Sequence, residues 1–231
     1  MNDERAIARA ALADAGEPRR LPHAVVRFHR HVDDILARSH AAHGTQVACR
    51  RGCSLCCSLQ VEVLPPEAFA LAQSLKARLA PKALEAVRAK LRANVERIAA
   101  IGLEARKRTN LPCALLGADG ACTAYESRPA QCRRFHSTRL ATCEASYADP
   151  ADDAIESPAH PAVAHNAQVI VTLAQHGLRD AGLDATPVDM NLALCAALDD
   201  AKAWRRWRDG KKPFVTAAEP EPALATPAAS R

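Results

Sequence analysis

Eight of the nine cysteines in this 231-residue chain fall into two groups, and thiols are the side chains here with the most chemistry available to them. The first group places four thiols within nine residues: Cys49, Cys53, Cys56 and Cys57. The second is spaced by eight, nine and ten residues: Cys113, Cys122, Cys132 and Cys143. Soft thiolates select zinc, cuprous ions and iron–sulfur clusters. The two groups therefore predict a metal centre ligated by these eight cysteines.

The N-terminus favours reduced thiols over disulfides. Asp3 and Glu4 occupy positions where an export signal needs positive charge. No stretch approaches the roughly 20 apolar residues of a membrane span, so we expect no membrane partner. The predicted location is the cytoplasm, where thiols remain available to metals. A disulfide-stapled protein is the alternative, and the odd number of cysteines argues against it.

The spacing within the first group leaves the number of metal sites open. Cys49-x3-Cys53-x2-Cys56 puts three thiols on one tight loop, which suits one face of a metal or cluster. Neighbouring side chains such as those of Cys56 and Cys57 point in different directions, so one compact site seldom takes both. The loop either serves two sites or carries one ligand and one spare thiol. Eight thiols match two four-thiolate sites, or one four-iron cluster plus one zinc.

The other candidate residues carry weaker signals. Cys195 lies between Leu194 and Leu198 on an amphipathic segment, where a small buried apolar role is expected. His136 follows Cys132 by four residues and would suit zinc, but we expect a surface or capping role for it. The chain has no glycine-rich phosphate loop, Gly-x-Ser-x-Gly elbow or His-Glu-x-x-His pair. No catalytic residue is predicted.

Basic residues flank the cysteines in sequence. They would lower the thiol pKa values and offset the negative charge of a thiolate-ligated centre. These residues are Arg50, Arg51, Arg106, Lys107, Arg108, Arg128, Arg133, Arg134 and Arg139. The net charge of +5 by itself gives little support for a polyanionic partner, and only 3% of the residues are aromatic. These values argue against nucleic-acid binding.

The elements that must position these cysteines are mostly helices, because Ala, Leu and Arg are abundant and aromatic residues are rare. The predicted fold class is mainly α: a helical domain with a small irregular or β-hairpin cysteine-rich core. Hydrophobic periodicity and helix-ending residues place helices at about 2–15, 22–43, 65–79, 81–108, 160–181 and 188–207. A short strand is expected at 59–64 and a hairpin, with an Asp-Gly turn, at 111–125. The helices 65–79 and 81–108 separate the two cysteine groups and must fold the chain back so that the groups meet.

Four regions follow from this pattern. They are an N-terminal helical segment (1–46), a cysteine-cluster metal-binding domain with two spacer helices (47–145), C-terminal helices packing on the same core (146–210) and a disordered tail (211–231). The tail is expected from its Ala, Pro and Glu composition.

Two longer motifs surround the cysteines. The first is Cys49-x3-Cys53-x2-Cys56-Cys57, followed by an apolar stretch and a helix that opens Pro65-Pro66-Glu67-Ala68. The second is Pro112-Cys113-x8-Cys122-x2-Tyr125-Glu126-x-Arg128-Pro129-x2-Cys132-Arg133-x-Phe135. In both motifs the chain resembles the YkgJ-type cysteine-cluster family, also described as a zinc- or iron-chelating domain. The resemblance implies a metal centre built from these cysteines, with zinc and iron–sulfur both proposed. Tyr125, Arg128 and Pro129 are expected to shape the loop before Cys132.

These observations predict a cytoplasmic metal-binding protein with a redox, sensing or accessory role. Its cysteines would hold an iron–sulfur cluster or zinc in one or two sites, and an unidentified protein partner is compatible with this role.

The first alternative is a metal-dependent enzyme. Some longer chains with a similar cluster are flagellin lysine methylases, which makes group transfer such as protein methylation conceivable, and an oxidoreductase is a further option. Cys-x3-Cys-x2-Cys is also the spacing of radical enzymes that use S-adenosylmethionine. Those enzymes need a β/α barrel, and the residues after Cys57 lack its strand–helix alternation.

The second alternative is a zinc-organised nucleic-acid-binding module. Its phosphate contacts would be Arg106-Lys107-Arg108 and Arg133-Arg134.

Overall fold

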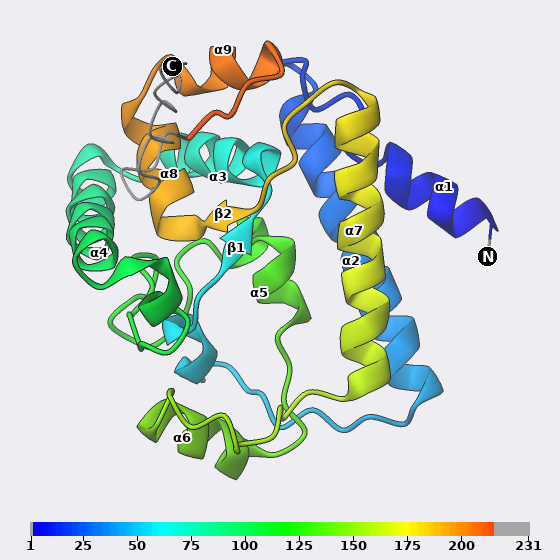
Figure 1. Ribbon diagram of the computed structural model, residues 1–231, viewed down its shortest axis with the longest axis vertical. Coiled ribbons are helices and arrows are strands. Elements are labelled where there is room, and N and C mark those ends of the chain that lie inside the picture. The colour runs from blue at the N-terminus through cyan, green and yellow to red at the C-terminus, as the bar shows by residue number, and fades with distance from the viewer. Residues whose placement is uncertain (1, 215–231) are drawn as a thin grey trace, which may run out of the picture.

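Helices carry almost all the regular structure of the computed structural model, which describes residues 2–214 (Figure 1). The α-helices are α1 (Asn2–Ala10), α2 (Leu21–Ala42), α3 (Pro65–Arg78), α4 (Pro81–Arg106), α5 (Ala130–Arg134), α6 (Leu140–Ala148), α7 (Pro161–Asp180), α8 (Met190–Asp199) and α9 (Ala203–Arg208). Short 3₁₀ helices are η1 (Leu55–Ser58) and η2 (Tyr125–Ser127). Strands β1 (Glu62–Val63) and β2 (Val188–Asp189) form one small antiparallel pair. The mainly α fold class is confirmed.

One side of the molecule is built from α1, α2 and α7, with α2 and α7 running side by side (Figure 1). Leu12, Phe28 and Leu178 are fully buried there. A Cβ at Gly177 would lie 1.7 Å from the backbone oxygen of Arg9, so only glycine lets α7 approach the end of α1 this closely. We call α1, α2 and α7 the helical side.

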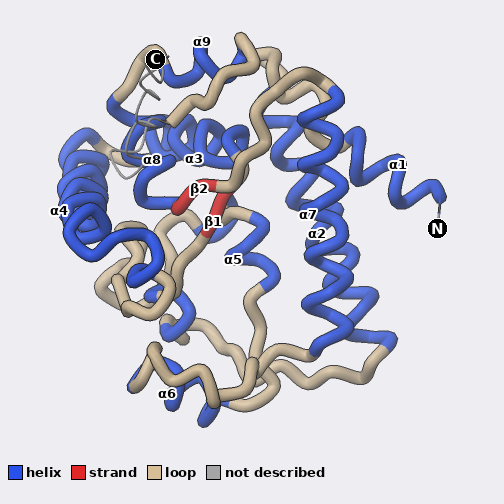
Figure 2. The backbone as a smooth tube through the Cα atoms, viewed as in Figure 1, coloured by secondary structure: helices blue, strands red, loops and turns tan. Residues whose placement is uncertain are grey.

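The opposite side has α3 and α4 packed on α8, with the cysteine-bearing segments below them. Figure 2 shows that long loops join α4, α5 and α6 in this region. We call the segments 48–58 and 106–129, together with α5 and α6, the cysteine side. No helix within residues 2–214 is both long and apolar enough to cross a membrane.

The end of the chain differs from the expected single helix over 188–207. Residues 188–189 pair with β1, and the helix is then interrupted between α8 and α9. Asp200 causes this interruption, because its carboxylate accepts from the backbone N–H of Lys202 and from Arg206. Trp207 is fully buried and donates its indole N–H to the carbonyl of Asp184.

The expected tail over 211–231 is described only as far as Phe214. That side chain is 5% exposed, and its ring lies 5.3 Å from the ring of Phe69. Residues 215–231 lie outside the described part of the chain.

The expected hairpin over 111–125 forms its turn but little of its ladder. The turn is held by the Gly117 N–H, which donates to Ala121 O, and by the Asp119 carboxylate, which accepts from Ala121 N–H. Pairing is confined to one bridge between Leu116 and Cys122. The residues before the turn bond elsewhere, to the first cysteine group.

Candidate metal centre

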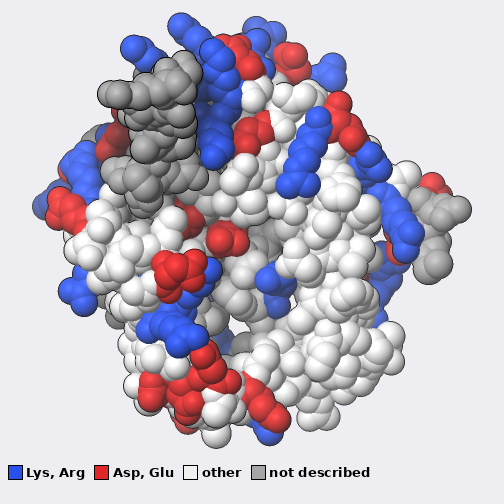
Figure 3. All heavy atoms as spheres, in the orientation of Figure 1, with Lys and Arg blue, Asp and Glu red and all other residues white. Residues whose placement is uncertain are grey.

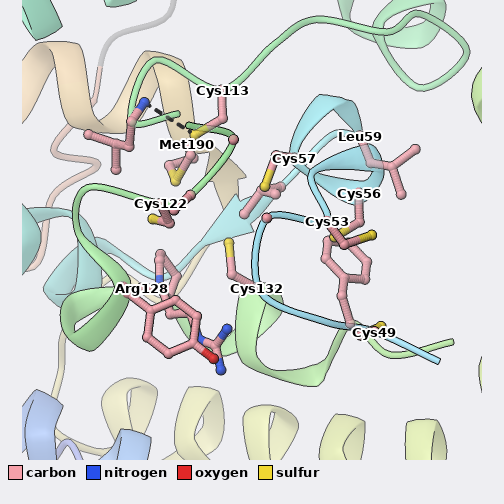
Figure 4. A pocket seen from close by; sticks show the side chains of 18 of the residues that line it. Cys49, Cys53, Cys56, Cys57, Leu59, Cys113, Cys122, Arg128, Cys132 and Met190 are labelled. Carbon is pink, nitrogen blue, oxygen red and sulfur yellow. Dashed lines mark hydrogen bonds between the residues drawn. The ribbon is translucent and has the colours of Figure 1, made fainter. Parts of the chain in front are cut away.

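Seven of the eight clustered cysteines line one cavity of about 680 Å³ (Figure 4). They are Cys49, Cys53, Cys56, Cys57, Cys113, Cys122 and Cys132. Cys143, on α6, does not line it. The two spacer helices, α3 and α4, therefore fold the chain back, so that cysteines more than 50 residues apart in sequence line the same cavity.

The first cysteine group forms two consecutive tight turns. Gly52 has φ 83°, a left-handed conformation that favours glycine, and the Cys53 N–H donates back to Arg50 O. Gly120, in the turn of the second group, has φ 74°, and a Cβ there would lie 3.0 Å from Gly52 O. The tips of the two cysteine-bearing segments thus meet backbone to backbone, where a side chain would hold them apart.

Backbone hydrogen bonds continue this contact deeper in the site. The N–H of Cys113 donates to the carbonyl of Cys57 at 2.9 Å. The N–H of Leu111 donates to the carbonyl of Ser58 at 3.0 Å. The start of the second group is therefore fixed against the end of the first, whatever occupies the cavity.

Arg106, at the end of α4, ties these segments together from behind. Its side chain is 1% exposed, and its guanidinium donates to the backbone carbonyls of Ser58, Leu59 and Thr109. Its Nε lies 3.5 Å from a carboxylate oxygen of Asp189, which is also buried. Burial lowers the pKa of Arg106, and the nearby carboxylate of Asp189 opposes this shift. Arg106, a candidate phosphate contact by sequence, is instead an internal connector.

Glu67 makes a second buried connection, between α2, α3 and α5. One carboxylate oxygen accepts from the Ala130 N–H at 2.7 Å and lies 2.9 Å from His29 Nε2. The other accepts from the Leu64 N–H at 3.0 Å. Ala130 is the first residue of α5, which carries Cys132. This carboxylate therefore fixes the position of one thiol.

Three of the four thiols of the second group lie against the core. Cys113, Cys122 and Cys132 pack against the hydrophobic core. Burial raises the pKa of Cys113 to about 12 and that of Cys132 well above its usual range, and it also raises the pKa of Cys122. Thiols in such surroundings stay protonated until a cation compensates the thiolate charge. This donor set fits a bound metal, which supplies that charge.

The adjacent pair in the first group behaves differently. The neighbouring Cys56 thiol lowers the pKa of Cys57 to about 7, and the guanidinium of Arg128 acts in the same direction. Cys57 in turn raises the pKa of Cys56. Arg128 also stacks over Tyr125, 4.0 Å from the ring centroid. Besides shaping the loop, as expected, Arg128 supplies positive charge to the thiols.

Two candidates lie outside the cavity. Cys195 is partly buried on α8 and does not line the site. His136 has both ring nitrogens engaged: Nδ1 with the carbonyl of Arg134 at 3.0 Å, and Nε2 as acceptor from the His160 N–H at the start of α7. His136 thus has the expected capping role. Within residues 2–214, no three His, Cys, Asp or Glu side chains already surround one point closely enough to hold a metal ion.

Comparison with known families gives the class of this site. Residues 48–156 match the family model CxxCxxCC, described as "Putative zinc- or iron-chelating domain". This match agrees with the cysteine-cluster family that the motifs resemble, and it covers a little under half of the chain. No curated protein and no solved structure matches the chain.

Proposed function

We propose that this protein uses its clustered cysteines to hold an iron–sulfur or zinc centre, and that it acts in redox chemistry, sensing or as an accessory factor in the cytoplasm. The observation that carries the proposal is the convergence of seven thiols, from three separate stretches of chain, on one cavity. The residues that would hold metal are Cys49, Cys53, Cys56, Cys57, Cys113, Cys122, Cys132 and Cys143.

The surroundings suit a negatively charged centre. Arg128 acts on Cys57 and Cys122, and Arg106 lies close enough to Cys113 for their charges to interact. When bound, an iron–sulfur cluster would supply one-electron redox chemistry, whereas zinc would supply a fixed positive charge. The chain contributes thiolate donors, nearby cations and an apolar wall, which together tune such a centre.

The test is metal analysis and an absorption spectrum on protein purified without oxygen. A brown protein absorbing near 400 nm, with about four irons per centre, would identify an iron–sulfur protein. A colourless protein with about one or two zinc ions per chain would favour a structural or binding role. Absence of both metals from a folded, reduced protein that also fails to take them up would contradict the proposal. The matched control is Cys195→Ser, which should keep the wild-type metal content.

A metal-dependent enzyme is the second candidate, and the size of the cavity favours it. A volume of about 680 Å³ exceeds what a single ion needs, and it lies in the range of small-molecule sites, roughly 300–1,000 Å³. Tyr125 is 55% exposed, and both it and Arg128 line the cavity. Saturable S-adenosylmethionine binding to the metal-loaded protein, measured by calorimetry, would support group transfer. Failure to bind would remove the methylase version of this candidate.

Nucleic-acid binding ranks third because its proposed phosphate contacts have other partners. Arg106 is buried, and Arg133 forms a 2.5 Å ion pair with Asp33. Lys107 and Arg108 pair with Glu104 and Asp153 at the surface. On the face shown in Figure 3, acidic and basic side chains are interspersed.

A further inference from the structure

We infer that the eight clustered thiols form two separate four-thiol metal sites that share the loop at Cys56 and Cys57. The inner site consists of Cys57, Cys113, Cys122 and Cys132. The outer site consists of Cys49, Cys53, Cys56 and Cys143. This pairing rests on the proposed function, because it assigns ligands to the metal centre proposed there.

The inner four thiols face one another across the cavity (Figure 4). The backbone bond from Cys113 to Cys57 and the bridge at Cys122 hold three of them in place, and α5 brings in Cys132. Every pair within this set is close enough for electrostatic interaction between the thiols. Cys132 interacts with the other three, Cys113 with Cys122 and Cys57, and Cys122 with Cys57. No thiol of the set stands apart from the rest.

The outer thiols make a different set of neighbours. The Cys49 thiol interacts with Cys53 and Cys143, and Cys56 interacts with Cys49. Figure 4 shows the Cys53 and Cys56 side chains next to each other. Cys143 belongs with them because α6, which carries it, packs against η1, which carries Cys56.

A backbone hydrogen bond brings the two chain segments of this outer group together. The N–H of Ala48 donates to the carbonyl of Ser137 at 2.7 Å, which holds the chain before Cys49 against the connection between α5 and α6. Cys49, Cys53 and Cys56 line the main cavity and Cys143 does not, so the outer site lies at the edge of this cavity, next to α6.

The geometry of η1 explains how adjacent cysteines serve different sites. Successive side chains on a 3₁₀ helix point about 120° apart. Cys56 and Cys57 both lie on η1, so their thiols leave it in different directions. Cys56 still interacts with Cys57 and Cys132, so the two sites are neighbours.

The two sites have different surroundings and therefore different roles. Three inner thiols pack on the hydrophobic core, whereas Cys49 is exposed and is followed by exposed Arg50 and Arg51. The inner metal stabilises the fold. The outer metal is the one that exchanges with solution and responds to oxidants or chelators.

Substitution of the adjacent cysteines tests the pairing. The measured quantity is the metal content per chain of the full-length protein. Cys56→Ser and Cys57→Ser each remove one thiol from neighbouring positions, and each should retain only the metal of the other site. The double variant C56S/C57S, which damages both sites, should retain almost none. C57S/C132S, which damages the inner site twice, should retain the same content as Cys57→Ser alone. Cys195→Ser should match the wild type.

Other patterns would overturn the pairing. A C56S/C57S content no lower than that of either single variant would mean one shared site. A loss in C57S/C132S that exceeds the Cys57→Ser loss would place those two thiols in different sites. A wild-type protein that binds no metal would contradict the proposed function itself, whereas the two earlier results leave it standing.

A second measurement on wild-type protein applies if the inner variants do not fold. Metal would be withdrawn stepwise with a chelator, and the thiols exposed at each step would be alkylated and located by mass spectrometry. The pairing predicts that Cys49, Cys53, Cys56 and Cys143 are alkylated together first, with the inner four protected. Early alkylation that mixes thiols of both sets would overturn it.

Discussion

The helical side and the cysteine side are stabilised by different interactions. On the helical side, large apolar side chains such as Leu12, Phe28 and Leu178 are fully buried. The cysteine side depends on buried charged groups, Arg106 and Glu67, that satisfy backbone groups of loops. Hydrophobic burial is independent of ligands, whereas a loop region full of thiols gains its free energy from metal binding. We therefore expect the helical side to keep its structure without metal and the cysteine side to depend on metal binding.

Metal removal gives the largest expected effect. Structural zinc sites in small peptides contribute about 10–16 kcal/mol of apparent binding free energy, which is also folding free energy. Chelation under reducing conditions should therefore increase hydrogen exchange strongly in residues 49–58 and 111–134. The amides of α2 and α7 should remain protected. An equal loss of protection on both sides would contradict the division, and mock-treated protein with metal restored is the control.

Arg106→Met should be the most damaging single substitution on the cysteine side. It removes donors to three backbone carbonyls and leaves Asp189 buried without its cation. Breaking a buried pair in this way costs about 3–5 kcal/mol, measured by urea denaturation. Metal content should fall as well. Arg108→Met, at an exposed ion pair two residues on, should change stability by no more than about 0.5 kcal/mol. Equal effects of the two substitutions would show that Arg106 is not a connector.

Leu178→Ala tests the helical side with a similar loss of stability and a different consequence for metal. Truncation of this fully buried leucine should cost about 2–5 kcal/mol. The folded fraction should keep its full metal content, because Leu178 lies on α7, away from the thiols. The control is Ile7→Ala on α1, where the side chain is 51% exposed. Loss of metal from folded Leu178→Ala protein would show that the two sides are coupled more tightly than we infer.

The contrast between the two sides also explains which features of the fold and the site could be predicted from the sequence. Cysteine spacing singled out eight thiols, seven of which line one cavity, and helical periodicity located most helices. Arg106 stands in a basic run with Lys107 and Arg108, and nothing in the sequence distinguishes it from them as a buried connector. Gly102, with φ 81°, interrupts α4 just before it, so the buried face marked by Val87, Leu91 and Ile98 cannot be extended to residue 106.

Glu67 was missed as a connector for another reason. Its partner Ala130 is 63 residues away, and single-sequence patterns carry no information about that pairing. The available signal was its position: a carboxylate directly after Pro65 and Pro66 at the start of an otherwise apolar helix. The partners of β2 and the break at Asp200 likewise depend on contacts made only in the folded chain.

Glu67→Gln should have an intermediate effect. The amide keeps one acceptor oxygen but places an NH₂ group against a backbone N–H, at either Ala130 or Leu64. A buried polar group left unsatisfied costs about 1–3 kcal/mol. The melting temperature should fall, and metal content should fall less than in Cys132→Ser, because only the position of α5 is affected. Glu104→Gln, whose side chain is 88% exposed, is the matched control. No change in melting temperature for Glu67→Gln would contradict its connecting role.

The smallest predicted effect lies where the two sides meet, at His40 near the end of α2. Its ring lies 4.8 Å from that of His136, at right angles to it. Burial lowers the pKa of His40, and the neighbouring His136 and His160 lower it further. The unfolded chain therefore takes up this proton more readily than the folded one, so the contribution to stability is complete above about pH 6.5 and is lost as the pH falls below it.

His40→Gln should reduce the loss of stability between pH 7.5 and pH 5.5, measured by urea denaturation. His23→Gln, at an exposed position on the same helix, should leave that loss unchanged. Protonation of the thiolates contributes equally to both variants, so the difference between them isolates His40. Identical pH profiles for the two variants would mean that the contact between α2 and the cysteine side does not sense protonation. Metal binding alone would then account for the acid sensitivity of the protein.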